Sequence, residues 1–268
     1  MTETLRTQLR PGAKSKTTRS RNMNGDSVGI QDPAGRIIIA LDVDNREKGL
    51  ALVGRLPDAV IFKVGMELFT AEGPSLLADI KALAKQPFLD LKFHDIPNTA
   101  AEAVRMAVRH GVFMMTLHTS GGAEMMGRAA AVAAEEAGKR NIPKPLLLGV
   151  TVLTSLKGEQ LLEIGMAADV REQVRRLAGL ARRAGLDGVV CSPQEIGTIR
   201  RDAGPGFLIV TPGIRPAWAA ANDQKRIMTP WEAMDQGADY LVIGRPVTAS
   251  PSPRDSFVRI VEEIKGRS

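Results

Sequence analysis

The sequence has one cysteine, few aromatic residues and no long apolar segment. Cys191 is the single cysteine among 268 residues, which excludes an internal disulfide framework and a cysteine-cluster zinc site. One cysteine also suits a reducing compartment. No apolar run approaches the roughly 20 residues needed to cross a bilayer, and we expect no secretory signal. We therefore expect a cytoplasmic protein without a membrane partner.

Positive charge is concentrated near the N-terminus. The formal net charge is +6, and residues 1–35 contribute half of it, with six Lys or Arg against three Asp or Glu. The rest of the chain is only mildly basic, and aromatic residues make up 4% of the sequence. A nucleic-acid surface usually combines a concentrated basic patch with stacking aromatics. We therefore expect no nucleic-acid partner.

The first 33 residues differ in character from the remainder. Residues 1–33 are polar, rich in Thr and Arg, and without apolar periodicity, which predicts a disordered basic tail. Arg with Ser and Thr also resembles an organellar transit peptide, but Pro11 and Gly12 interrupt the segment. A start of translation at Met23, inside this segment, is an alternative left open by the sequence. Residues 34–268 contain no internal boundary and are predicted to form a single catalytic domain.

Short apolar runs alternate with longer amphipathic segments from Arg36 onward. Such alternation predicts parallel strands joined by right-handed helical crossovers. Eight evenly spaced units favour a closed (β/α)8 TIM barrel of class α/β, with about eight helices, over an open doubly wound sheet. The predicted strands are Ile37–Val43, Val60–Gly65, Phe88–Phe93, Phe113–His118, Leu146–Leu153, Gly188–Cys191, Phe207–Thr211 and Tyr240–Gly244.

Charged residues collect at the predicted C-terminal ends of the first three strands. In the third strand, Asp90, Lys92 and His94 alternate with apolar residues, so strand periodicity places them on one face, toward the barrel mouth. Lys63 alternates with apolar neighbours in the second strand, and Asp42 lies near the end of the first. Catalytic groups of this fold lie at these strand ends. The sequence therefore predicts that two lysines and two aspartates converge in a small volume.

This charge cluster has two alternative interpretations. One is a buried ion-pair network without a catalytic role. The other is a metal site with Asp42, Asp90 and His118 as ligands, although the two lysines already neutralise the carboxylates and a divalent cation would compete with them. We expect no metal, and we expect both His94 and His118 to be hydrogen-bonded structural residues.

The last two predicted strands lead into segments suited to phosphate. They run into Thr211–Pro216 and Val242–Pro246, which contain Gly213, Arg215 and Arg245. Loops after strands 7 and 8 form the usual phosphate site of such barrels. Glycine lets backbone N–H groups approach an anion, and arginine offers a bidentate fork. We therefore predict a phosphate site here.

Residues 90–99, with the sequence DLKFHDIPNT, resemble the signature of bacterial orotidine 5′-phosphate decarboxylases. The DxKxxD core alone is shared with other enzymes of the same barrel superfamily, whereas the ten-residue stretch with the arginine motifs is more specific. The resemblance covers about residues 36–265 and departs at no motif position. Its other motifs are Ala40–Asp42, Lys63–Gly65, Val150–Ser155, Thr211–Pro216 and Ile243–Pro246.

The resemblance implies an activity and a set of residue roles. The activity is cofactor-independent decarboxylation of orotidine 5′-monophosphate to uridine 5′-monophosphate and CO2, the last step of de novo UMP biosynthesis, in a homodimer with shared active sites. Asp95 and Thr99 would serve the site of the neighbouring subunit. The resemblance implies catalytic roles for Lys63, Asp90, Lys92 and Asp95, and substrate binding by Asp42, Lys63, Asp90, Thr99, Thr154, Arg215, Gln224, Gly244 and Arg245.

Two rival functions remain at this point. A related barrel enzyme acting on a sugar phosphate, such as a hexulose-phosphate synthase or a keto-sugar-phosphate decarboxylase, would need a divalent metal at the strand ends. A catalytically silent barrel would only bind nucleotides or partners, and the presence of both Asp90 and Lys92 speaks against it.

Overall fold

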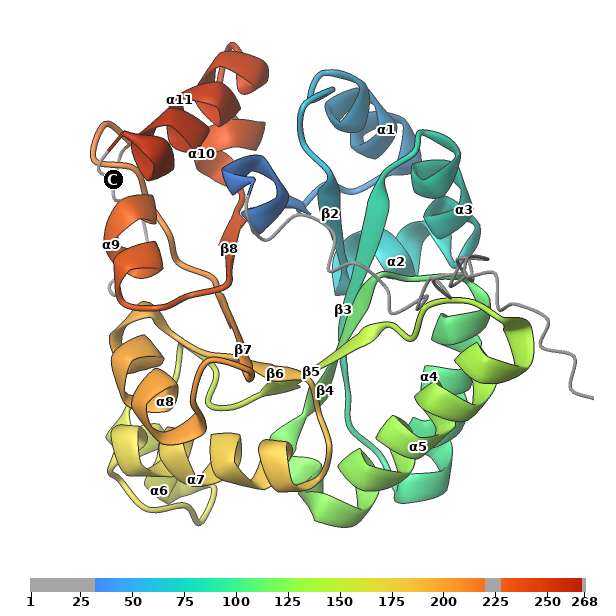
Figure 1. Ribbon diagram of the computed structural model, residues 1–268, viewed down its shortest axis with the longest axis vertical. Coiled ribbons are helices and arrows are strands. Elements are labelled where there is room, and N and C mark those ends of the chain that lie inside the picture. The colour runs from blue at the N-terminus through green and yellow to red at the C-terminus, as the bar shows by residue number, and fades with distance from the viewer. Residues whose placement is uncertain (1–31, 220–227, 267–268) are drawn as a thin grey trace, which may run out of the picture.

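Parallel strands close into a barrel with helices around its outside, as Figure 1 shows in a view into the ring of strands. The computed structural model describes residues 32–219 and 228–266. Except for its last two residues, the predicted tail of residues 1–33 lies outside these ranges. The eight strands are β1 (Ile37–Leu41), β2 (Ile61–Gly65), β3 (Gln86–Phe93), β4 (Met114–His118), β5 (Leu146–Val150), β6 (Gly188–Val190), β7 (Leu208–Thr211) and β8 (Tyr240–Ile243).

The strand order confirms the predicted (β/α)8 barrel. Each strand pairs in parallel with the next, and pairing of Ile37 with Leu241 joins β1 to β8 and closes the ring. All eight predicted strands are present, with ends that differ by a few residues from the expected ones. Within the described residues, none of the helices is long and apolar enough to span a bilayer.

The described residues contain more helices than the eight expected. Paired helices follow β2, β5 and β8, whereas one α-helix follows each of the other strands. The α-helices are α1 (Arg46–Gly54), α2 (Met66–Glu72), α3 (Ser75–Ala82), α4 (Pro97–Arg109), α5 (Gly122–Arg140), α6 (Gly158–Glu163), α7 (Val170–Arg183), α8 (Ile196–Ala203), α9 (Pro230–Asp235), α10 (Arg245–Thr248) and α11 (Pro253–Lys265). The 3-10 helices are η1 (Pro33–Arg36), η2 (Thr119–Gly121) and η3 (Pro193–Glu195).

Local sequence signals start several of these helices. Asn45 caps α1 by accepting a hydrogen bond from the Lys48 N–H, and Asp169 caps α7 in the same way. Thr229 opens α9 with a capping box. Pro97 begins α4, where its missing N–H has no helical partner to lose. These caps fix where the chain leaves the strand ends and enters the helical layer.

The two faces of each strand have different roles. Ile37, Ile39 and Leu41 point outward into the large apolar layer between strands and helices, whereas Ile38 joins a smaller buried cluster inside the barrel. Ile61 and Phe88 belong to the same inner cluster. Apolar side chains therefore fill the lower part of the barrel interior, and the next inward residues of β2 and β3 are charged.

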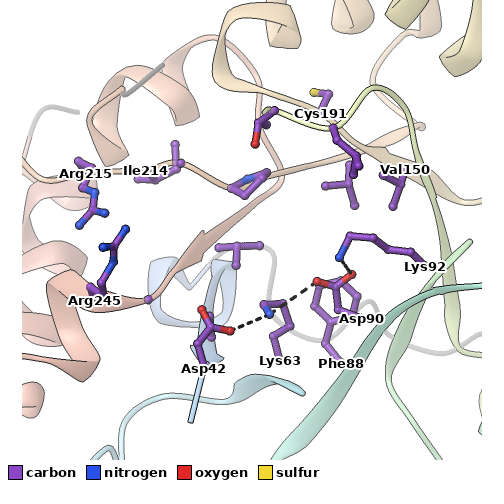
Figure 2. A pocket seen from close by; sticks show the side chains of 18 of the residues that line it. Asp42, Lys63, Phe88, Asp90, Lys92, Val150, Cys191, Ile214, Arg215 and Arg245 are labelled. Atoms are coloured by element: carbon purple, nitrogen blue, oxygen red, sulfur yellow. Dashed lines mark hydrogen bonds and ion pairs between the residues drawn. The ribbon is translucent and has the colours of Figure 1, made fainter. Parts of the chain in front are cut away.

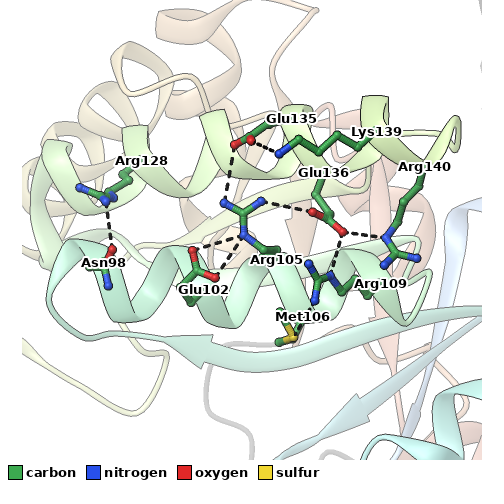
Figure 3. Close-up of polar contacts among 10 residues, drawn as sticks. All are labelled: Asn98, Glu102, Arg105, Met106, Arg109, Arg128, Glu135, Glu136, Lys139 and Arg140. Carbon is green, nitrogen blue, oxygen red and sulfur yellow. Dashed lines mark hydrogen bonds and ion pairs between the residues drawn. The ribbon is translucent and has the colours of Figure 1, made fainter.

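A buried glutamate ties α4 to α5. The carboxylate of Glu136 on α5 accepts hydrogen bonds from Arg109 (2.8 Å) and Arg105 (3.2 Å) of α4 and from Arg140 of its own helix (2.7 Å), as Figure 3 shows. These hydrogen bonds, that from Arg109 first, hold the pKa of Glu136 at about 2. Helix α4 follows the charged end of β3, so this network fixes the helix behind the predicted site.

We expect Glu136→Gln to lower the melting temperature at pH 7 by several degrees. A carboxylate whose pKa is lowered in the folded state stabilises the fold at pH values above its ordinary pKa of about 4.5. It loses that contribution as the pH falls toward 2. The difference between wild type and variant should therefore shrink between pH 5 and pH 3, measured by circular dichroism.

The matched control is Glu172→Gln. Glu172 also has a pKa lowered to about 2, but its partners Arg175 and Arg176 lie on its own helix, at the surface. Glu172→Gln should lower the melting temperature less than Glu136→Gln does, because ion pairs within one exposed helix contribute little to stability. Equal melting temperatures for wild type and Glu136→Gln at pH 7 would contradict the assigned role of the network.

Candidate active site

A pocket of about 310 Å³ lies at the C-terminal ends of the strands. Its volume is in the range of small-molecule sites. Figure 2 shows charged side chains at both ends of this pocket, with apolar residues between them. The lining residues are Ala40, Asp42, Lys63, Phe88, Asp90, Lys92, Val150, Val152, Leu153, Thr154, Val190, Cys191, Pro212, Gly213, Ile214, Arg215, Val242, Gly244, Arg245 and Pro246.

Four charges of alternating sign line one side of the pocket. The Lys63 ammonium lies 3.2 Å from the Asp42 carboxylate and 3.6 Å from that of Asp90. The Lys92 ammonium lies 3.0 Å from the other Asp90 oxygen. The predicted convergence of two lysines and two aspartates is therefore confirmed, and we call these four residues the charge array.

Burial makes the central pair of the charge array, Lys63 and Asp90, costly. The side chains of Lys63 and Asp90 are 12% and 14% exposed. Withdrawing charges from water costs several kcal/mol per ion, and buried pairs are therefore weak evidence of stabilisation. Gly65 contributes to the arrangement, because a Cβ at this position would lie 3.1 Å from the Lys63 ammonium. The sequence Lys63–Gly65 thus leaves space for the central cation.

The backbone at Lys92 departs from a regular strand. Its φ is +53°, and the pairing register between β3 and β4 shifts between Leu89 and Phe93. The hydroxyl of Thr116 on β4 accepts a hydrogen bond from the Lys92 N–H (2.9 Å) and donates one to Asp90 Oδ1 (3.0 Å). Sequence reasoning missed Thr116. The available signal was a hydroxyl on the same face of β4 as Met114, among the apolar residues that precede His118.

The expected alternation in β3 is correct for Asp90 and Lys92 and wrong for His94. His94 does not line the pocket, and its ring stacks on that of His118 with centroids 5.3 Å apart. The register shift and the left-handed Lys92 interrupt the strand period on which that expectation rested. Ser120 hydrogen-bonds to His118 Nδ1 at 2.6 Å, so His118 is hydrogen-bonded as expected.

The surroundings of His118 disfavour its charged form. The pKa of His118 is lowered by burial first, and then by the neighbouring His94 and Lys92. The metal site considered for Asp42, Asp90 and His118 is not assembled, because Lys63 lies between the two carboxylates and His118 faces His94. In residues 32–219 and 228–266, no three His, Cys, Asp or Glu side chains are grouped as around a metal ion.

The opposite end of the pocket carries two arginines. Figure 2 shows the guanidinium groups of Arg215 and Arg245 pointing toward one another, on the opposite side of the pocket from Asp90 and Lys92. Arg215 is 5% exposed, and its backbone N–H donates to the Met228 carbonyl at 2.9 Å. Gly213 has φ +81°, a conformation that favours glycine, and it turns the chain between β7 and Arg215. An anion between the arginines would meet two planar donor groups.

Eight of the predicted site residues line this pocket: Asp42, Lys63, Asp90, Lys92, Thr154, Arg215, Gly244 and Arg245. Asp95 and Thr99 do not; both are exposed beyond the end of β3. Gln224 lies outside the described residues. Cys191 is buried as expected, and burial raises the pKa of its thiol, so it is not an activated nucleophile.

Known proteins resemble this chain over the whole barrel. Residues 35–260 match the model described as Orotidine 5′-phosphate decarboxylase / HUMPS family. The orotidine 5′-phosphate decarboxylase of Moorella thermoacetica is 53% identical over 232 residues, which cover 86% of this chain and 92% of the relative. That of Syntrophomonas wolfei subsp. wolfei is 50% identical over 233 residues, 86% of this chain and 98% of the relative.

Solved structures agree with this result. The crystal structure of orotidine 5′-phosphate decarboxylase from Lactobacillus acidophilus superposes with a TM-score of 0.77 at 36% identity, and the match covers 86% of this chain and 99% of that one. An uncharacterized conserved protein from Geobacillus kaustophilus gives a TM-score of 0.75 at 34% identity, over 85% of this chain and 99% of that one.

Proposed function

The chain belongs to the orotidine 5′-phosphate decarboxylase / HUMPS family, and we propose from this premise that it decarboxylates orotidine 5′-monophosphate. The products are uridine 5′-monophosphate and CO2, and the reaction is the last step of de novo UMP biosynthesis. The observation that carries the proposal is the charge array at one end of a pocket whose other end presents Arg215 and Arg245. A nucleotide whose base carries a carboxylate would place its phosphate at the two arginines and its carboxylate beside the Lys92 ammonium.

The chemistry requires a cation next to the reacting carbon. Cleavage of the C6–carboxylate bond releases CO2 and leaves an electron pair on C6 of the pyrimidine. A preorganised positive charge stabilises this carbanion character, and the Lys92 ammonium then transfers a proton to C6. Solvent returns a proton to Lys92 after the reaction. Lys63 and Asp90 hold Lys92 in place through the ion pairs of the array.

Asp90 has a second proposed role. Its carboxylate lies 3.0 Å from the Lys92 ammonium, so a substrate carboxylate beside Lys92 comes close to a second negative charge. This repulsion is absent once CO2 has left, because the product carries a hydrogen at C6 in place of the carboxylate. The array therefore disfavours the bound substrate relative to the transition state.

Substrate binding is divided between the two ends of the pocket. We assign the ribose hydroxyls to Asp42 and Lys63, the pyrimidine to Thr154, and the phosphate to Arg215, Gly244 and Arg245. Gln224 remains a proposed phosphate ligand, on sequence grounds alone. Binding the distant phosphate holds the ring against Lys92 and so contributes to the rate as well as to affinity. Independence from a cofactor, from a metal and from nucleic acid stays a prediction.

We also propose a homodimer with shared active sites. Asp95 and Thr99 are exposed and do not line the pocket of their own chain. Beside Asp95, Ile96 is 67% exposed, and Met66, which follows the neighbouring strand β2, is 57% exposed. An isologous interface over these residues would cover apolar surface and bring Asp95 to the neighbouring pocket. A cytoplasmic location completes the proposal, since the single cysteine suits a reducing compartment.

The first prediction concerns the proton donor. Lys92→Ala should lower the turnover number at least about 1,000-fold, because it removes both the stabilising charge and the proton source. The assay follows the absorbance change of orotidine 5′-monophosphate with a chelator present. Lys144→Ala is the matched control, since Lys144 pairs with Asp187 at the other end of the barrel (2.6 Å) and should leave activity unchanged. An inactive wild type would contradict the function, and an active Lys92→Ala would contradict the assignment.

The second prediction concerns phosphate recognition. Arg215→Ala should raise KM for orotidine 5′-monophosphate about 10- to 100-fold, because a charge-assisted hydrogen bond to phosphate is lost. The comparison substrate is orotidine without its phosphate, on which wild type and variant should perform about equally. Equal impairment on both substrates would exclude a phosphate-specific role. Melting temperatures of both proteins check that the buried position tolerates alanine.

The third prediction tests the shared site by mixing Lys92→Ala with Asp95→Ala. If Asp95 serves the neighbouring subunit, a mixed dimer has one site lacking both groups and one intact site. Random exchange at 1:1 then restores roughly a quarter of all sites. The control mixes Lys92→Ala with Asp90→Ala, which both act within their own pocket and should restore none. No recovery in the first mixture, with exchange verified by differently tagged subunits, would eliminate the shared site.

A further inference from the structure

The catalytic lysine has a backbone conformation that its own side chain disfavours. Lys92 has φ +53°, where residues with a Cβ are rarely found. The same stretch breaks the pairing of β3 with β4, which runs from Leu89 opposite Met115 to Phe93 opposite Leu117. Neighbouring groups must hold such a conformation in place.

Thr116 contacts both members of the Asp90–Lys92 pair. It is fully buried on β4, and it does not line the pocket. Its Oγ1 accepts the hydrogen bond of the Lys92 N–H at 2.9 Å and lies 3.0 Å from Asp90 Oδ1. Because a carboxylate only accepts, the single hydroxyl proton must be donated to Asp90. The hydroxyl therefore links the backbone of one residue to the side chain of the other.

These contacts form a closed ring of hydrogen bonds. The Lys92 N–H donates to Thr116, Thr116 donates to Asp90 Oδ1, and the Lys92 ammonium donates to the same Oδ1 at 3.0 Å. The left-handed backbone and the orientation of the carboxylate are thus determined together. A shift of the Lys92 backbone or of the Asp90 carboxylate would break a hydrogen bond in this ring.

We propose that Thr116 is a positioning residue for the decarboxylation, which holds Asp90 and the backbone of Lys92 in the arrangement that places the ammonium beside C6. This inference rests on the proposed function. It makes the hydroxyl, rather than the volume of the side chain, the required feature. It also predicts an effect on turnover rather than on binding, because Thr116 does not line the pocket, whereas Arg215 and Arg245 do.

The chain offers a matched control for a purely structural role. Thr119 is also fully buried, and its hydroxyl donates to the Val150 carbonyl at 2.7 Å. It follows the same strand as Thr116 and touches neither Asp90 nor Lys92 in the described contacts. Thr→Val at either position removes one buried hydroxyl at nearly constant volume. Only the change at position 116 removes a contact with the charge array.

The experiment compares Thr116→Val, Thr116→Ser and Thr119→Val, with kcat and KM for orotidine 5′-monophosphate and the melting temperature measured for each. Thr116→Val should lower kcat about 10- to 100-fold and change KM less than about threefold, because misplacing reacting groups slows the chemical step. Thr116→Ser should recover most of kcat. Thr119→Val should lose thermal stability but keep kcat within about threefold of wild type.

Several outcomes would overturn the inference. These are a Thr116→Val enzyme with near-normal kcat, equal kcat losses in Thr116→Val and Thr119→Val, or a Thr116→Ser enzyme as slow as Thr116→Val. If Thr116→Val does not fold, Thr116→Ala replaces it. Failure of both to fold beside a folded Thr119→Val would show that the hydroxyl serves stability. A wild type that does not decarboxylate the substrate would instead overturn the proposed function, and this inference with it.

Discussion

The ion pairs between Lys63 and two carboxylates are the interaction on which the rest of the site depends. Lys63 comes from β2 and lies between Asp42 after β1 and Asp90 on β3, so one cation joins three adjacent strands. Without Lys63, the Asp90 carboxylate, which is 14% exposed, would keep only Lys92 as a cationic partner, and the cost of burying it would rise. The length of Lys63 and the open space at Gly65 let it reach both partners.

The barrel keeps the two ends of the pocket apart and rigid. Strands β1 to β3 carry the charge array, whereas the loops after β7 and β8 carry Arg215 and Arg245. Continuous parallel pairing around the closed ring fixes the distance between these groups. Under the proposed function, this separation lets the protein use phosphate binding at one end to hold the ring against Lys92 at the other.

The end of β3 departs from regular strand geometry, and neighbouring polar groups hold it in place. A regular strand would place alternate residues on opposite faces, but the left-handed Lys92 and the register shift redirect the chain toward His94, Asp95 and α4. Behind this turn, the arginines of α4 gather around Glu136 of α5 and secure the helix (Figure 3). Thr116 thus holds the left-handed residue, and Glu136 holds the helix that follows it.

The sequence by itself determined the eight parallel strands, the closed barrel and the charged strand ends. Periodicity and spacing are local, and they place Lys63 and Asp90 inward because a strand alternates its faces. Tertiary structure alone decided that Lys63 lies between two carboxylates, that Thr116 bridges Asp90 and Lys92, and that His94 turns to His118. These features depend on the register between strands and on one left-handed residue, and the pattern of a single strand carries neither.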